Sequence, residues 1–202
     1  MNDQLIVFDF DKTMTEKDTV LGFYKEASTV KLLYCLKLPL LYLFALLTKL
    51  NVITNTELKR LGIKLFLRGL KREKLEKVAS DYSTKIKLNE VYRDDFGRYP
   101  PEKVVIMSAS YQTYLKPLFP NHRVVGSELL FDSSSQVADL HINMYGEQKK
   151  KWLNNQGIDE IDILFTDSYS DKPLMDIAKN VVMVKNGEKE LLKQNKDDLF
   201  YS

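Results

Sequence analysis

The sequence predicts an α/β fold: a Rossmann-like parallel sheet core with an inserted all-helical cap after the first strand and a small β-hairpin. Three observations predict it. A short apolar run at residues 5–8 ends in acidic residues, strand and helix patterns alternate from residue 103 onward, and residues 14–88 show helical spacing without a convincing strand. We therefore expect a core made of residues 1–13 and 89–202, with residues 14–88 as a helical cap.

The first strand is the run Leu5, Ile6, Val7 and Phe8, whose apolar and β-branched side chains are typical of a strand buried on both faces. Further strands are predicted at residues 103–107, 123–126, 161–165 and 181–184, and helices at residues 111–118, 149–155 and 173–179. A polar run at 131–135 separates two alternating segments, which predicts a β-hairpin over 128–142. The polar residues 189–202 are expected to form a last helix or a frayed end.

The predicted cap contains three or four helices, because apolar residues such as Leu58, Leu61 and Leu65 recur at helical spacing. Its segment 32–50 is strongly apolar. Lys37 and Pro39 interrupt it, and the longest uncharged apolar run, 38–47, is about half of the roughly 20 residues that a membrane span requires. We expect a hydrophobic helix or helical hairpin buried within the cap. The alternative is an interfacial segment that rests on a membrane between flanking lysines.

Composition narrows the classes of function. Of the 202 residues 44% are hydrophobic and 29% charged, which is enough to bury a core. The single cysteine, Cys35, excludes an intramolecular disulfide and is expected to be a small buried hydrophobe. His122 and His141 stand apart from each other, which disfavours a zinc site or a histidine-based triad. No secretory leader opens the sequence, so we expect a cytoplasmic protein.

Charge is distributed unevenly. Residues 14–88 carry 15 Lys plus Arg against 7 Asp plus Glu, a charge of +8, whereas the whole chain carries +2. The remainder therefore carries −6. A basic segment beside an acidic one suggests an anionic ligand or surface for the first and a metal site for the second.

Acidic residues follow the first strand directly. Asp9 and Asp11 lie two residues apart, so on an extended chain they point to the same side. Two acids in one place repel each other unless a cation or a shared proton holds them, which favours a metal-dependent site with one carboxylate as nucleophile or ligand and the other as proton donor. The alternative at this point is an aspartate that caps the next helix.

Other polar groups follow later strands. Ser108, with the backbone amides of Ala109 and Ser110, could hold an oxyanion, and the turn at 146–149 leads into a helix with an ammonium group at Lys149, Lys150 or Lys151. Asp167 and Asp171 follow the strand at 161–165. Because the carboxyl ends of parallel strands meet at one edge of a sheet, we expect Asp9, Asp11, Ser108 and Asp167 to be neighbours.

Together these motifs resemble those of the haloacid dehalogenase-like hydrolase superfamily, in order and in strand context. The cap position and the sequence Gly-Glu-Gln-Lys at 146–149 resemble its phosphoserine-phosphatase-like branch, which selects Lys149 among the three lysines. The match covers almost the whole chain and rests on Asp9-Phe10-Asp11-Lys12-Thr13, Ser108, Lys149 and Asp167-Ser168-x-x-Asp171. Lys12 and Thr166 depart from the family pattern, since glycine is common at both positions.

The resemblance implies a Mg²⁺-dependent phosphohydrolase. Asp9 would attack phosphorus and form an aspartyl-phosphate, while Asp11 would protonate the leaving alcohol and then deprotonate the attacking water. Mg²⁺ would be held by Asp9, Asp167 and the backbone carbonyl of Asp11. By the same resemblance, Ser108, Ala109 and Lys149 would bind the phosphoryl group, Asp171 would orient Lys149 or support the metal shell, and Thr13 would support the first motif.

The substrate is predicted less sharply. A basic and partly apolar cap suits an amphiphilic phosphate and resembles phosphatidylglycerophosphate phosphatases of the same branch, with a possible peripheral membrane contact through residues 32–50. The alternatives are a small soluble phosphomonoester such as phosphoserine, or a phosphotransferase or phosphomutase reaction. Asp18 stands where phosphoserine enzymes contact substrate, although it could instead cap the helix beginning at Thr19. A nucleic-acid partner is not expected, because the acids at the strand ends would then serve no purpose.

Overall fold

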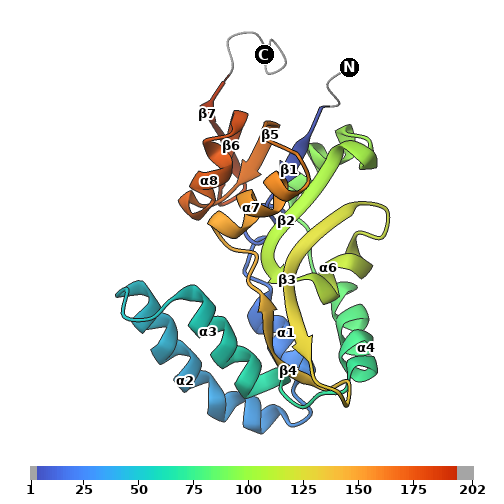
Figure 1. Ribbon diagram of the computed structural model, residues 1–202, viewed down its shortest axis with the longest axis vertical. Helices are drawn as coiled ribbons and strands as arrows, with labels where there is room; N and C mark the ends of the chain where they lie inside the picture. Colours follow the sequence, from blue (N-terminus) through green and yellow to red (C-terminus); the bar gives the residue numbers. More distant parts are fainter. Residues whose placement is uncertain (1–3, 195–202) are drawn as a thin grey trace.

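The computed structural model describes residues 4–194 and contains a seven-stranded sheet with helices on both faces (Figure 1). The strand order is β4-β3-β2-β1-β5-β6-β7. The five inner strands are parallel, and β4 and β7 pair antiparallel at the two edges. The strands are β1 (Ile6–Phe8), β2 (Val104–Tyr111), β3 (Arg123–Phe131), β4 (Val137–Ile142), β5 (Ile161–Thr166), β6 (Ala178–Lys185) and β7 (Glu188–Lys193).

The central strand β1 is buried on both faces, as its sequence predicts. Ile6 and Phe8 belong to one apolar cluster and Val7 to the other, because side chains alternate along a strand. Phe8 stacks on Phe165 of the neighbouring β5, with ring centroids 4.3 Å apart. The chain leaving β1 is therefore anchored by packing directly before the acidic residues.

Helices cover each face of the sheet. On one side α7 (Glu147–Asn155) and α8 (Lys172–Met175) pack their leucines against Val7. On the other, α5 (Glu90–Asp94) and α6 (Gln112–Leu118) join the cluster of Ile6 and Phe8. Short helical turns complete the connections at Phe96–Arg98, Pro101–Lys103 and Tyr169–Asp171. The predicted α/β architecture is confirmed.

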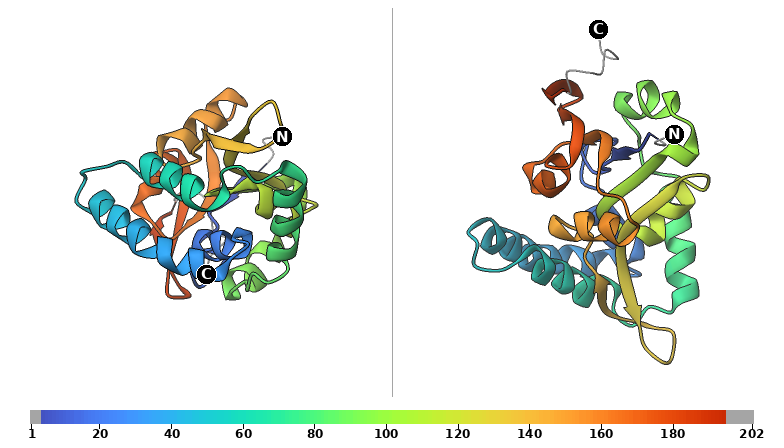
Figure 2. Two further views of the ribbon diagram at one scale, coloured as in Figure 1. Left: turned by 90° about the horizontal axis from the view of Figure 1, so that it is seen from below. Right: turned by 45° about the horizontal axis from the view of Figure 1, so that its top comes forward.

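The chain between β1 and β2 forms the helical insertion: α1 (Val20–Ala27), α2 (Lys31–Lys49), α3 (Asn55–Gly62) with the π-helical turn Ile63–Leu67, and α4 (Arg72–Ser83). Four helices agree with the predicted three or four. A reciprocal capping box between Thr54 and Glu57 starts α3. Figure 2 shows α2 and α3 projecting away from the sheet, whereas α4 runs alongside α6 (Figure 1). The exact domain limits at 13/14 and 88/89 stay a prediction.

The expectation that α2 is buried is wrong. It is one unbroken helix of 19 residues that continues through Lys37 and Pro39, and only Tyr34 and Leu41 are buried in it. It is long and apolar enough to cross a membrane, but the core helices of soluble proteins can have the same length and composition. Cys35 is likewise exposed. Exposed apolar side chains line much of this helix: Leu32, Leu33, Leu36, Leu40, Tyr42, Leu43 and Leu46.

Several predicted boundaries shift. β2 continues to Tyr111 and β3 to Phe131, and α8 ends at Met175 so that β6 starts at Ala178. Residues 188–193 are not helical but form β7, while residues 195–202 lie outside the described part of the chain. Asn186 and Gly187, with φ of 52° and 84°, make the two-residue turn that joins β6 to β7. This Asn-Gly pair is a hairpin signal that the sequence interpretation overlooked.

Candidate active site

Asp9 and Asp11 lie at the carboxyl edge of the sheet, between the ends of β2 and β5. The backbone N–H of Asp9 donates to the carbonyl of Phe165 over 2.8 Å, which extends the pairing of β1 and β5 by one residue. Asp9 is 8% exposed. The strand ends thus bring together the acidic residues that the sequence places far apart, as expected for a parallel sheet.

Lys149 joins two of these acids. Its ammonium donates to Asp9 Oδ1 over 2.8 Å and to Asp171 Oδ2 over 2.9 Å, and the lysine is 2% exposed. Lys150 is only partly buried and Lys151 is exposed, so Lys149 is the lysine that lies at Asp9. Gly146, with φ of 55°, makes the turn before α7 that directs Lys149 inward.

Asp171 is held in turn by Thr166, whose hydroxyl donates to Asp171 Oδ2 over 2.9 Å. The departure from glycine at position 166 therefore adds a hydrogen bond to the carboxylate that contacts Lys149. Burial lowers the pKa of Lys149, but the carboxylates of Asp9 and Asp171 outweigh it and raise that pKa above its ordinary value. Lys149 stays an ammonium group.

Burial raises the pKa of Asp9 to about 7, and the nearby carboxylates of Asp171 and Asp167 add to the effect. The ammonium of Lys149 opposes this increase. Thr13 donates to the second carboxylate oxygen of Asp9 over 3.4 Å, a long hydrogen bond. Asp9 is thus a buried carboxylate whose ionised form is stabilised by a neighbouring cation, the ammonium of Lys149.

Asp11 has different partners from Asp9. Its Oδ1 accepts from both the backbone N–H and the hydroxyl of Thr19, each over 2.7 Å, and its Oδ2 accepts from the hydroxyl of Ser110. The Thr19 hydroxyl also lies 2.8 Å from that of Tyr114. These contacts hold the carboxylate of Asp11 between Thr19 of the insertion and Ser110 of β2.

Burial raises the pKa of Asp11 to about 6, and the negative charge of Asp18 contributes in the same direction. The hydrogen bonds from Ser110 and Thr19 lower it, because they stabilise the ionised form. A carboxyl group with this pKa holds a proton over part of the range near neutrality, which a general acid requires.

The last residues of β2 carry hydroxyl groups, at Ser108 and Ser110. Ser108 is 1% exposed, and its hydroxyl accepts from the backbone N–H of Ser110 over 3.0 Å. The carbonyl of Ala109 accepts from the hydroxyl of Ser127 over 2.6 Å and from the ammonium of Lys59. Ser108 and Ala109 therefore lie beside Asp11, although the strand continues past them to Tyr111 instead of ending at Met107 as predicted.

Within residues 4–194, no three carboxylate, histidine or cysteine side chains stand close enough together to hold a metal ion by themselves. The side chain of Asp11 is already engaged by Thr19 and Ser110. Asp9 and Asp167 are close enough for the charge of Asp167 to raise the pKa of Asp9, and burial raises that of Asp167. A buried carboxylate, Asp9, and a half-buried one, Asp167, which repel each other, fit a hard cation such as Mg²⁺ with a backbone carbonyl as third ligand.

Lys12 has a left-handed backbone conformation, which glycine adopts most easily, and glycine is common at this position in the family pattern. Its φ is 62°, and its N–H donates to the hydroxyl of Thr15 over 3.1 Å. A left-handed conformation costs a non-glycine residue about 1–2 kcal/mol, which the surrounding loop must offset. The positive charge of Lys12 also lowers the pKa of Asp167.

Asp18 is not the N-cap of α1, because Thr19 takes that position, and its contact with substrate stays a prediction. Its Oδ1 accepts from the N–H of Val20 over 2.9 Å at the start of α1, where Thr19 occupies the N-cap position. It is also exposed to a cavity of about 350 Å³. That cavity extends from Asp11 and Ser110 at the sheet to Leu41 and Tyr42 on α2.

A second, larger cavity of about 870 Å³ lies on the side of Lys12 and Asp167. Its lining is more polar and includes Lys87, Arg93 and Lys185. The acids at the strand ends therefore border two cavities: one reaches α2, and the other lies between the two ends of the insertion and the end of β6.

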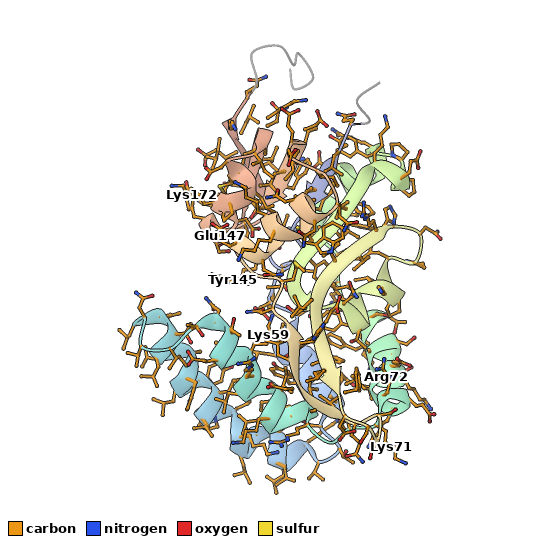
Figure 3. All side chains as sticks on the ribbon, in the orientation of Figure 1. Lys59, Lys71, Arg72, Tyr145, Glu147 and Lys172 are labelled. Carbon is orange, nitrogen blue, oxygen red and sulfur yellow. The ribbon has the colours of Figure 1, made fainter. Side chains whose placement is uncertain are left out.

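Four contributors were not found by sequence interpretation: the side chains of Thr19, Ser110, Lys59 and Asn143. Lys59 Nζ donates to Ser127 Oγ and to Asn143 Oδ1, each over 2.9 Å. Figure 3 shows Lys59 and Tyr145 at the junction between α3 and the sheet. Thr19 stands immediately after Asp18 and could have been noticed as a helix-start residue, whereas no local pattern distinguishes Lys59 from the other lysines of the insertion.

Comparison with known proteins agrees with this architecture. A family model of haloacid dehalogenase-like hydrolases matches residues 6–176. The chain belongs to the haloacid dehalogenase-like hydrolases. A search of curated proteins by sequence finds no match.

Solved structures share the fold at low identity. A protein of unknown function from Bordetella pertussis Tohama I is 13% identical with a TM-score of 0.68, covering 87% of both chains. A phosphoserine phosphohydrolase-like protein from Francisella tularensis is 18% identical with a TM-score of 0.62, covering 89% of this chain and 86% of its own.

A phospho-aspartyl intermediate analogue of phosphoserine phosphatase is 19% identical with a TM-score of 0.58, covering 91% of this chain and 87% of its own. The predicted enzyme class, a hydrolase with the fold of phosphatases, is confirmed by these comparisons.

Proposed function

We propose that this chain is a Mg²⁺-dependent phosphomonoester hydrolase that works through an aspartyl-phosphate on Asp9. The observation that carries the proposal is the different surroundings of two aspartates only two residues apart. Asp9 contacts the ammonium of Lys149, whereas Asp11 accepts hydrogen bonds from the hydroxyl groups of Thr19 and Ser110. Such a separation of environments is how enzymes assign nucleophile and acid/base roles to two carboxylates.

Magnesium would be held by the side chains of Asp9 and Asp167 and by the backbone carbonyl of Asp11. When bound, it would neutralise phosphoryl oxygens and the repulsion between the two carboxylates. Lys149 would contribute the second positive charge at the phosphoryl group, and its two carboxylate contacts keep it charged for that purpose.

The reacting residues then have distinct tasks. Asp9 attacks phosphorus in line and the alcohol leaves with a proton from Asp11. Asp11, now ionised, takes a proton from the water that hydrolyses the aspartyl-phosphate. Ser108 and the amide of Ala109 bind phosphoryl oxygens, Asp171 orients Lys149, and Thr13 supports Asp9.

Residues 14–88 would act as a cap that selects the substrate, and we propose a lipid phosphate such as phosphatidylglycerophosphate. The cavity supports this choice because it begins at Asp11 and Ser110 and ends among apolar residues of α2. The outer face of the same helix is rich in exposed leucines, and the cap segment carries a charge of +8. A basic, apolar surface favours an anionic membrane.

The membrane contact would be peripheral, from the cytoplasmic side. Tyr34 and Leu41 pack into the insertion, and Lys37 donates to the carbonyl of Leu65 over 2.6 Å, so one face of α2 is attached to the protein. A helix attached along one face can lie in a membrane surface with the other face.

A soluble phosphomonoester is the second candidate, favoured by Asp18 at the cavity and by the fold shared with phosphoserine phosphatases. Transfer to an alcohol acceptor, as in a phosphotransferase or phosphomutase, would use the same residues. Release of inorganic phosphate without any added acceptor distinguishes hydrolysis from transfer.

The test is a phosphate-release screen over lipid and soluble phosphomonoesters, with Mg²⁺ or with a chelator. We expect turnover that requires Mg²⁺ and is lost in Asp9→Asn. Undiminished release by Asp9→Asn, or equal rates with chelator, would contradict the proposal.

A further inference from the structure

Lys59, on the last turn of α3, places a positive charge at the cavity beside the catalytic acids. Its ammonium donates to three uncharged oxygens: the carbonyl of Ala109, the hydroxyl of Ser127 and the side-chain amide of Asn143. Among residues 4–194 no carboxylate lies within ion-pairing distance of it. Lys59 is therefore a cation with hydrogen-bond partners but no counter-ion in the described chain.

Removing an ammonium group from water without a counter-ion costs free energy. Desolvation lowers the pKa of Lys59 to about 8, although the more distant Asp11 and Asp18 oppose the change. Lys149, the other lysine at this site, is buried against two carboxylates. Lys59 is half-buried, so its cation would be stabilised by an anion at contact distance, and the cavity that it lines gives an anion access.

The position of Lys59 determines which part of a substrate it would meet. Asp11 and Ser110 line the same cavity, and Asp11 is the proposed donor to the leaving oxygen. Lys149, which lies at Asp9, serves the transferred phosphoryl group on the other side of the scissile bond. Lys59 therefore faces the alcohol side of the ester.

The geometry points to Lys59 as the binding residue for a second anionic group of the substrate, on the alcohol side of the phosphomonoester. The inference rests on the proposed function of Asp9 and Asp11. It narrows the substrate class to phosphomonoesters that carry another negative charge near the ester oxygen. That charge is a phosphodiester if the substrate is a lipid headgroup and a carboxylate if it is a small acid.

Matched pairs of esters test this. Glycerol 3-phosphate and 3-phosphoglycerate share a carbon skeleton and differ in one carboxylate. Phosphatidic acid has only its phosphomonoester, whereas a phosphatidylglycerol phosphorylated on its terminal hydroxyl adds a phosphodiester. Phosphate release is measured for all four, lipids in mixed micelles, with the wild-type chain and with Lys59→Gln, Lys59→Arg and the exposed control Lys64→Gln.

In at least one pair, we expect the wild type to prefer the ester that carries the additional carboxylate or phosphodiester. The preference should be about 10–100-fold in kcat/KM, the range of a hydrogen bond between charged groups. Lys59→Gln should remove the preference by raising KM for the ester with the additional anionic group. The kcat/KM of the ester without that group should stay nearly the same. Lys59→Arg keeps most of the preference, and Lys64→Gln keeps all of it. The pair that shows the preference identifies a lipid or a soluble substrate.

Two results would overturn the assignment of Lys59 while leaving the proposed hydrolase intact: turnover without preference for a second anion, or an equal loss on both members of a pair in Lys59→Gln. The equal loss would indicate that Lys59 only holds α3 against the sheet. Absence of phosphate release from every ester by the wild type would instead overturn the proposed function, and this inference with it. Thermal unfolding of each variant verifies that it is folded.

Discussion

The sheet edge and the helical insertion each bring a lysine to the same site, but they surround it differently. Lys149, from α7, contacts the carboxylates of Asp9 and Asp171 at 2.8 and 2.9 Å. Lys59, from α3, donates to uncharged oxygens and lies 5.5 Å from the ring centroid of Tyr111, and it has no carboxylate contact within the described residues. The ammonium of Lys149 thus has carboxylate partners within the protein, whereas the insertion presents an ammonium group with which an anionic ligand can pair.

This difference separates two tasks. In the proposed mechanism the strand ends act on any phosphate ester, because Lys149 contacts Asp9 and Asp171 and none of the three belongs to the insertion. In the same proposal, the insertion contacts the variable part of the substrate in the cavity between Asp11 and α2. We therefore expect changes at the sheet edge to affect the chemical step for all substrates, and changes in the insertion to affect only some.

The largest effect is expected for Lys149→Met. Loss of the ammonium should lower kcat by about 10²–10³-fold for every ester, the typical cost of one electrostatic stabiliser of the transition state. It also leaves two buried carboxylates without their cationic partner, which should destabilise the fold by about 3–5 kcal/mol at neutral pH.

Phosphate-release kinetics and denaturant unfolding measure these two effects. Lys150→Met, at the neighbouring and partly exposed lysine, is the control and should resemble the wild type. Equal kinetics in both variants would mean that the charge at Asp9 does not assist the reaction.

A large and selective effect is expected for the double change Leu40→Glu and Leu43→Glu on the exposed face of α2. The two leucines are 42% and 52% exposed, so the fold should tolerate the change. Each leucine that enters a bilayer contributes about 1.5–3 kcal/mol, so binding to anionic vesicles should fall by at least about 10²-fold.

Vesicle flotation measures the binding, with hydrolysis of a soluble ester as the control for an intact site. If the wild-type chain stays entirely in the soluble fraction, the membrane contact is wrong and α2 has another partner.

A smaller effect is expected for Ser110→Ala, and it concerns pH. Asp11 must be protonated to act as acid, so kcat/KM should fall as pH rises through its pKa of about 6. The hydrogen bond from Ser110 stabilises the ionised form and lowers this pKa. Removing it should therefore shift the falling part of the pH profile to higher pH.

Profiles of kcat/KM for the wild type and Ser110→Ala, recorded at saturating Mg²⁺, test the direction of this shift. A shift to lower pH would show that another group limits the reaction on the alkaline side.

The smallest effect is expected for Thr166→Val, which keeps the shape of the side chain and removes its hydroxyl. Asp171 loses one of its hydrogen bonds, so stability should fall by about 1 kcal/mol and kcat by a few-fold. The control is Thr84→Val, because Thr84 is exposed and its hydroxyl donates only to the backbone carbonyl of Asp81, away from Asp171. A kcat equal to that of the wild type would mean that Lys149 holds Asp171 sufficiently by itself.

The sequence predicts the sheet edge far better than the insertion. Asp9, Ser108, Lys149 and Asp167 each follow or precede a buried strand or turn with a strong local pattern, and a parallel sheet then has only one edge at which they can meet. Their neighbourhood therefore follows from topology.

The insertion is different because its contacts depend on how helices pack. Leu32, Leu36 and Leu43 look like core residues in the sequence, yet they are exposed because α2 contacts the protein mainly through Tyr34 and Leu41. Helical spacing cannot show which face finds a partner. For the same reason Lys59 could not be distinguished from its neighbours until α3 was placed against β2, β3 and the segment after β4.

The proposed mechanism requires a covalent phosphoryl group at Asp9. Acid-quenched protein, mixed with Mg²⁺ and a substrate from the screen, can be digested and the peptide containing Asp9 weighed by mass spectrometry. We expect that peptide to gain the mass of one phosphoryl group, more persistently in Asp11→Asn because hydrolysis of the intermediate loses its base, and not at all in Asp9→Asn. Rapid turnover in which Asp11→Asn accumulates no phosphoryl group, or accumulates it on another residue, would contradict this mechanism.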